Sequence, residues 1–233
     1  MRIEYPYYPW ALPVEVPDHL WVGTLEPQLS AQHCDASTLI ERALDNPIGT
    51  PPLTDLLGRS RRVVILIDDN TRWTPGHLIL PPVLTQMEKA GIIREQILIL
   101  VGYGTHRPMT DAERRQKLGD EICAAYQIEE HNAWDATRLR FCGTTEAGTA
   151  LWISRRVIEA DFVIGIGSIV PHPLAGFSGG GKILQPGACG EQTTIQTHWS
   201  GLRYRQIELL AERTIPCAEK SMRSRCKPAC ASL

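Results

Sequence analysis

Three apolar, largely β-branched runs constrain the fold of this chain more than any other feature of its sequence. They occupy residues 62–67, 96–101 and 161–167, and each is nearly unbroken by polar residues. Strands that are buried on both faces of a parallel sheet have this pattern, and helix-forming segments separate the runs. The sequence therefore predicts an α/β fold, with a Rossmann-like, mainly parallel sheet flanked by helices.

Local signals predict the elements around this sheet. A capping box at Thr110 to Glu113 predicts the start of a helix that stops at Gly119. Turn residues between two short apolar runs predict a hairpin over 139–153. Further helices are expected at 37–44 and at 82–90, and the remainder of residues 1–60 is expected to be an irregular, proline-rich lead-in.

Composition excludes several classes of protein. The 233 residues suit one α/β domain or one and a half, and 24 basic against 26 acidic residues give no electrostatic reason to expect nucleic acid. No apolar run approaches the ~20 residues of a membrane helix, and the N-terminus lacks a secretory apolar segment. With seven cysteines in no CxxC spacing, we expect reduced thiols and a cytoplasmic location.

A glycine-rich segment follows the third apolar run. Five glycines lie within residues 176–187, with His172 and Lys182 in the same segment and His198 beyond it. Such glycine density indicates either a flexible surface loop or backbone that lies against a ligand. The preceding strand and the spaced ionisable side chains favour the second interpretation, a binding site.

The nearest general motif is the phosphate-binding loop G-x-x-x-x-G-K-[ST]. Gly176 to Lys182 matches it, but Ile183 stands where the motif requires a hydroxyl to ligate Mg²⁺. We therefore predict a lysine-bearing loop that cradles an anion and is not an ordinary ATP site.

Two further loops follow the first two predicted strands. In the first, Arg72 is suited to clamp a carboxylate or phosphate and Asp69 to orient it, although turn chemistry alone is an alternative. In the second, His106 follows a core strand, and a structural and a functional role are equally open. Ligands of open parallel sheets bind beyond the carboxyl ends of the strands, so both loops are candidate parts of one site.

Three motifs together resemble the nickel-dependent lactate racemase family. They are Asp68-Asp-Asn-Thr-Arg-Trp-Thr-Pro75, Gly104-Thr-His-Arg-Pro-Met109 and Pro171-His-Pro-Leu-Ala-Gly-Phe-Ser-Gly-Gly-Gly-Lys182, and His198 follows them. The resemblance runs from about residue 10 to about residue 210. It implies that residues 1–212 correspond to the N-terminal α/β domain of a two-domain family.

The resemblance also implies a cofactor, a nickel-pincer nucleotide (a pyridinium-3-thioamide-5-thiocarboxylate mononucleotide). Lys182 would carry it covalently and His198 would complete the coordination of nickel, a set of soft sulfur and imidazole donors that suits planar Ni(II). Arg72 would hold an anion, either the substrate carboxylate or the cofactor phosphate, with Asp69 beside it. Backbone N–H groups of Gly179, Gly180 and Gly181 would approach the cofactor phosphate.

In the same family pattern, His106 and His172 form the acid–base pair, one on each face of C2 of a 2-hydroxyacid. One imidazole takes the hydroxyl proton while hydride leaves C2 for the cofactor, and the second donates a proton after the keto acid is reduced on its other face. A pKa near neutrality suits histidine to both roles.

Two departures from the family pattern bear on activity. Gln185 stands where an apolar residue is expected, and the chain has about half the family's length. The basic segment 213–233 is expected to be an aberrant or disordered tail, with the family's second domain absent or supplied in trans. A racemase or epimerase, a non-catalytic cofactor-binding remnant and an ordinary nucleotide-binding protein are the three alternatives. Neither the particular 2-hydroxyacid nor the oligomeric state is predicted.

Overall fold

The computed structural model describes residues 1–7, 10–23, 35–58, 60–202 and 210. The chain divides into two compact units, Met1–Asp35 and Ala36–Leu233. In the first, β1 (Arg2–Tyr7) and β2 (Trp10–Glu15) pair antiparallel. The irregular lead-in expected here is therefore wrong for residues 2–15. Prolines within these strands hide the sequence pattern of a strand. Proline is nevertheless tolerated here, because both strands of a two-stranded hairpin are edge strands.

The second unit is built on a four-stranded sheet with the order β5-β4-β3-β8, and all of its neighbouring strands are parallel. Its strands are β3 (Val63–Asp68), β4 (Ile97–Gly102), β5 (Gln127–Glu130) and β8 (Phe162–Ile166). Asp68 is in register with Gly102, and Ile67 with Ile166, so β3, β4 and β8 end at one edge. The predicted α/β fold with a mainly parallel sheet is confirmed.

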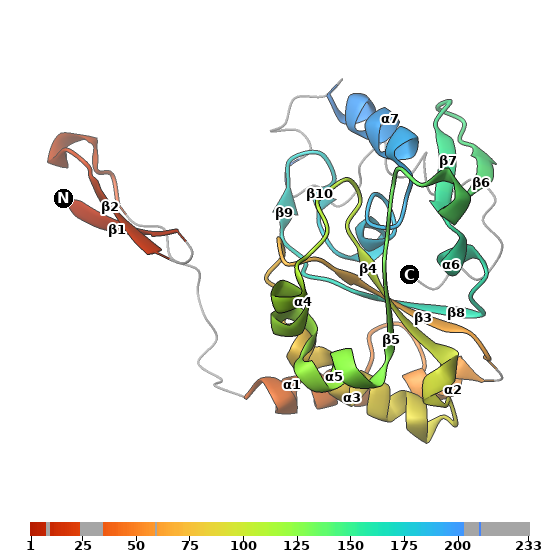
Figure 1. The fold of residues 1–233 in the computed structure, drawn as a ribbon. Helices are drawn as coiled ribbons and strands as arrows, with labels where there is room; N and C mark the ends of the chain where they lie inside the picture. Colours follow the sequence, from red (N-terminus) through yellow and green to blue (C-terminus); the bar gives the residue numbers. More distant parts are fainter. Residues whose placement is uncertain (8–9, 24–34, 59, 203–209, 211–233) are drawn as a thin grey trace. The chain divides into compact units, whose positions relative to one another are not determined.

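Both faces of the sheet are covered, as Figure 1 shows. Ile65 and Ile67 of β3 face a cluster formed with the helices on one side, while Val64 and Leu66 face a smaller cluster on the other. The helices of the first side are α1 (Ala36–Asp45), α2 (Leu53–Leu57), α3 (Gly76–Lys89), α4 (Asp111–Leu118) and α5 (Asp120–Ala125). The opposite side holds the hairpin β6 (Leu139–Thr144) and β7 (Ala150–Ser154), α6 (Arg155–Ile158) and the 3-10 turn η4 (Gly180–Ile183). Burial on both faces explains the unbroken apolar runs.

Two elements differ from the sequence prediction. Helix α3 begins at Gly76 and contains Pro81 and Pro82, whereas a start near residue 82 was expected. Its first turns are held by packing: Leu80 is fully buried, and Gly76 leaves room for the backbone carbonyl of Lys117. Strand β5 was not predicted, because an edge strand that is only partly buried needs no apolar run.

The glycine-rich segment returns to the carboxyl edge of the sheet. It contains the short hairpin of β9 (Pro171–His172) and β10 (Gly176–Phe177), then η4, and leads to α7 (Glu191–Gly201). The predicted 139–153 hairpin and the Thr110–Glu113 capping box are both present. No helix in the described part of the chain is long and apolar enough to cross a membrane. The segment 213–233 and its cysteines lie outside the described residues.

Candidate active site

A cleft of about 230 Å³ lies at the carboxyl edge of the sheet. It is lined by residues from the loops after β3, β4 and β8 and from α7. Among them are all the predicted ionisable site residues: Asp69, Arg72, His106, His172, Lys182 and His198. Three loops and a helix that are far apart in the sequence thus contribute to one cavity.

Asp69 and His106 form an ion pair at the start of two of these loops. Nδ1 of His106 lies 2.6 Å from Oδ2 of Asp69, and Thr71 donates hydrogen bonds to the other carboxylate oxygen from its backbone N–H and its hydroxyl. Burial raises the pKa of Asp69, but the hydrogen bonds from His106 and Thr71 outweigh burial, so that the pKa is lowered. An ionised carboxylate can only accept, so Nδ1 of His106 carries a proton and Nε2 is the ring atom left for a substrate.

A buried ion pair supports the loop that carries Arg72. The Lys117 amine lies 2.7 Å from Oδ1 of Asp68 and donates to the backbone carbonyl of Arg72 at 3.0 Å. That ion pair is the only polar contact of Asp68 Oδ1 among the described residues. The second carboxylate oxygen of Asp68 accepts from the hydroxyl of Thr74, which also contacts Ser168 at the end of β8. Lys117 therefore fixes the loop that presents Arg72.

We expect Lys117→Met to reduce the free energy of unfolding by about 3–5 kcal/mol, because it leaves the buried Asp68 carboxylate without a cationic partner. Urea-induced unfolding measures this loss. Lys89→Met, at an exposed position in the last turn of α3, is the matched control and should be near neutral. A Lys117→Met chain as stable as this control would contradict the assignment.

The glycine-rich segment turns tightly and presents Lys182 from η4. Gly179 has φ +72°, and a Cβ there would lie 2.9 Å from the Ile169 side chain, so only glycine fits. The amine of Lys182 has no hydrogen bond or ion pair with any described residue. Burial, and then the charge of Arg72, lowers its pKa, which increases the neutral, nucleophilic fraction. Ile183 is buried in the core, and the loop offers no hydroxyl for Mg²⁺ at that position.

His172 lies in a different electrostatic environment from His106. Its Nδ1 accepts hydrogen bonds from the backbone N–H groups of Leu174 (3.1 Å) and Ala175 (3.2 Å). Burial lowers the pKa of His172 to about 4, and the charges of Lys182, Arg72 and His198 act in the same direction. In this arrangement the ring is neutral and carries its proton on Nε2.

His198 projects from α7 with its imidazole oriented by its own helix. Its Nδ1 lies 2.7 Å from the backbone carbonyl of Thr194, an atom that can only accept, so Nδ1 is the protonated nitrogen. Nε2 then keeps a lone pair. Metal-ligating histidines are commonly held by such a second hydrogen bond.

The structure differs from the sequence analysis in detail. Gly179 lines the cleft, but Gly180 and Gly181 do not. Gln185, which departs from the expected apolar residue, donates to the hydroxyl of Thr197 on α7. The sequence analysis also missed Lys117, whose position in a predicted helix gave no signal of a contact 45 residues away.

Comparison with known proteins identifies the family. The family model of the lactate racemase N-terminal domain matches residues 7–208. The chain belongs to the lactate racemase N-terminal domain family. Lactate racemases from Thermoanaerobacterium thermosaccharolyticum and Lactiplantibacillus plantarum are each 33% identical to it, over 201 and 200 residues. These alignments cover 85% of this chain and 47% of each relative, so the chain spans about half the length of these curated relatives.

Solved structures support the same relationship for this lactate racemase family member. The lactate racemase apoprotein from T. thermosaccharolyticum superposes with a TM-score of 0.72 at 32% identity, covering 84% of this chain and 45% of that one. A Thermotoga maritima protein superposes with a TM-score of 0.67 at 24% identity, over 78% of this chain, and shows the fold alone.

Proposed function

We propose that this chain supplies the cofactor-binding half of a 2-hydroxyacid racemase or epimerase of the lactate type. One observation carries the proposal: a partly buried lysine lines a single cleft together with three oriented imidazoles, and each imidazole has a different set of partners. The proposed cofactor is the nickel-pincer nucleotide attached to Lys182, and when bound it supplies a reversible acceptor for the C2 hydride.

The cleft residues fit this cofactor. Covalent attachment needs an uncharged amine, and the partly buried Lys182, with no partner among the described residues, provides one more readily than a surface lysine does. A nickel ligand needs a free imidazole nitrogen, and the contact with Thr194 leaves Nε2 of His198 free. Gly179 brings backbone close to the cleft without a side chain, which suits the approach of a phosphate.

The imidazoles of His106 and His172 are suited to different steps of the proton transfer. Asp69 accepts from Nδ1 of His106, which leaves Nε2 of His106 as the ring atom for proton exchange with a substrate. Attachment of Lys182 removes its charge, which is one cause of the lowered pKa of His172. Arg72 is the cation available for the substrate carboxylate or the cofactor phosphate.

We expect the 233-residue chain by itself to take up cofactor but to racemise 2-hydroxyacids slowly. The side chain of His106 is 44% exposed in this half, and hydride transfer needs water excluded by a covering element. A small misplacement of reacting atoms costs roughly 10²-fold. Chiral chromatography of D- and L-lactate after incubation with the loaded chain measures the rate.

The matched experiment adds, in trans, the part of the T. thermosaccharolyticum relative that this chain does not span. This addition should increase the rate, and the same addition to a Lys182→Ala chain should not. Full family-like activity of the 233 residues alone, with a monomeric mass in solution, would contradict the expectation. A loaded chain that stays inactive with the added part would count against the racemase proposal and favour a non-catalytic cofactor-binding domain.

A further inference from the structure

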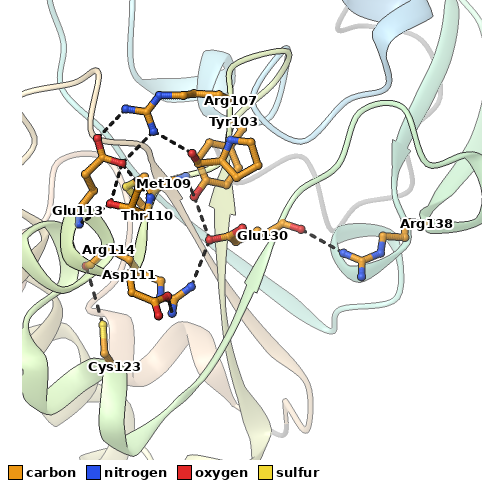
Figure 2. Close-up of polar contacts among 11 residues, drawn as sticks. Tyr103, Arg107, Met109, Thr110, Asp111, Glu113, Arg114, Cys123, Glu130 and Arg138 are labelled. Atoms are coloured by element: carbon orange, nitrogen blue, oxygen red, sulfur yellow. Dashed lines mark hydrogen bonds and ion pairs between the residues drawn. The ribbon is translucent and has the colours of Figure 1, made fainter.

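Glu113, on α4, accepts hydrogen bonds from both loops that carry the Asp69–His106 pair. Its Oε1 accepts from Nδ2 of Asn70 at 2.9 Å and from Nη2 of Arg107 at 2.6 Å. Its Oε2 accepts from Nη1 of Arg107 at 2.8 Å and from the backbone N–H of Thr110 at 2.8 Å. Figure 2 shows the Arg107 and Thr110 contacts converging on this carboxylate.

The capping box explains only part of this arrangement. A cap at the start of α4 needs one side-chain oxygen at the third helical position to accept from the backbone of Thr110, and Oε2 of Glu113 does so. Nothing in the cap requires Oε1, whose two contacts both reach outside the helix. The hydrogen bonds from Arg107, then the backbone contact with Thr110, lower the pKa of Glu113 to about 2, so the carboxylate is ionised at neutral pH.

The two residues that contact Oε1 of Glu113 are direct sequence neighbours of the Asp69–His106 pair. Asn70 follows Asp69 directly, and Arg107 follows His106 directly. The carboxylate of Glu113 therefore links the residue next to Asp69 to the residue next to His106, although more than thirty residues separate the two loops in the sequence. Among the described residues, Glu129 also accepts two hydrogen bonds from one arginine, from Nε and Nη2 of Arg156, but it does not line the cleft.

We propose that Glu113 is a positioning residue, which ties the loop after β3 to the loop after β4 and so sets the contact between Asp69 and His106. The proposal rests on the proposed role of His106 for its importance to catalysis. The geometry itself is testable on the chain without cofactor, so its failure is distinguishable from failure of the proposed function.

The deciding variant is Glu113→Gln. Glutamine keeps an oxygen for the cap, because glutamine also serves at that position of a capping box. It places an NH₂ group where Oε1 accepts from Asn70 and from Nη2 of Arg107, so these two contacts are lost. The remaining oxygen keeps the helix start and the contact with Nη1 of Arg107. Nitrogen-15 NMR of His106 should then show a smaller fraction of the Nδ1–H tautomer than in the wild type. The pKa of Asp69, followed by carbon-13 NMR, should rise toward its ordinary value.

Two further variants make the test specific. Glu129→Gln disrupts another bidentate pair, with Arg156, in which the Glu129 side chain is exposed to a degree similar to that of Glu113. It should leave both NMR signals unchanged. Asn70→Ala removes only the contact with the β3 loop and should cause a smaller change in the same direction. Wild-type signals for Asp69 and His106 in Glu113→Gln, with the chain folded, would overturn the proposal.

Discussion

Lys182→Ala is expected to abolish covalent loading of the chain and to reduce racemisation to background. Without the amine, no bond to the cofactor can form, and the nickel loses most of its expected ligands. Wild-type chain co-expressed with a cofactor-synthesis system and nickel should gain mass and absorb visible light. The variant prepared in the same way should keep the mass of its sequence, which intact-mass spectrometry measures directly.

Two controls separate attachment from charge. Lys182→Arg keeps a cation beside Arg72 but lacks an amine that can be acylated, so it should also remain unmodified. Lys89→Ala, at an exposed position of α3, should load like the wild type. A wild-type chain that stays unmodified under these conditions would refute the attachment, as would an equal mass gain on Lys182→Ala.

The fold was largely predictable because its central strands are buried on both faces. Val64 and Ile65 face opposite clusters, and this double burial left an unbroken apolar run in the sequence. The same physics explains what was missed. Strand β5 lies at an edge and carries polar residues, so it produces no such run. The hairpin at residues 2–15 is stabilised by strand pairing, with prolines at positions that a propensity argument rejects.

The residues of the candidate site could be predicted from the sequence, but the hydrogen bonds and ion pairs that hold them in place could not. Asp69 and His106 could be expected together because each follows a parallel strand, and the carboxyl ends of such strands meet at one edge. The contacts that Glu113 and Lys117 of α4 make with the site loops could not be predicted. Glu113 contacts a residue 43 positions away, and Lys117 contacts one 45 positions away. The capping box marks Glu113 only as part of a helix start, and no motif marks Lys117.

The opposed environments of the two candidate acid–base residues also depend on the tertiary structure. The carboxylate of Asp69 contacts His106, whereas the charges nearest His172 are the cations of Lys182 and Arg72. The two imidazoles therefore differ in the groups that face them: a carboxylate accepts from His106, whereas burial and nearby cations lower the pKa of His172. Racemisation requires that one imidazole be able to accept a proton while the other is able to donate one.

We expect His106→Asn and His172→Asn each to slow racemisation of the loaded, completed enzyme by roughly 10²–10⁴-fold. In the proposed mechanism each turnover uses both imidazoles, one to remove the hydroxyl proton and one to return a proton on the other face. Because the two enantiomers have equal free energy, kcat/KM must fall by the same factor for both of them. Polarimetry or chiral chromatography from each enantiomer measures the two rates.

The controls for this last prediction use loading as well as rate. Both variants should gain the same mass as the wild type, because neither residue forms the bond to the cofactor, whereas His198→Ala should lose nickel and keep the organic adduct. His77→Asn, at an exposed position of α3 outside the cleft, should retain the wild-type rate. A loaded His106→Asn or His172→Asn enzyme that keeps the full rate would remove that residue from the mechanism. If both keep it, proton transfer must be assigned to other groups.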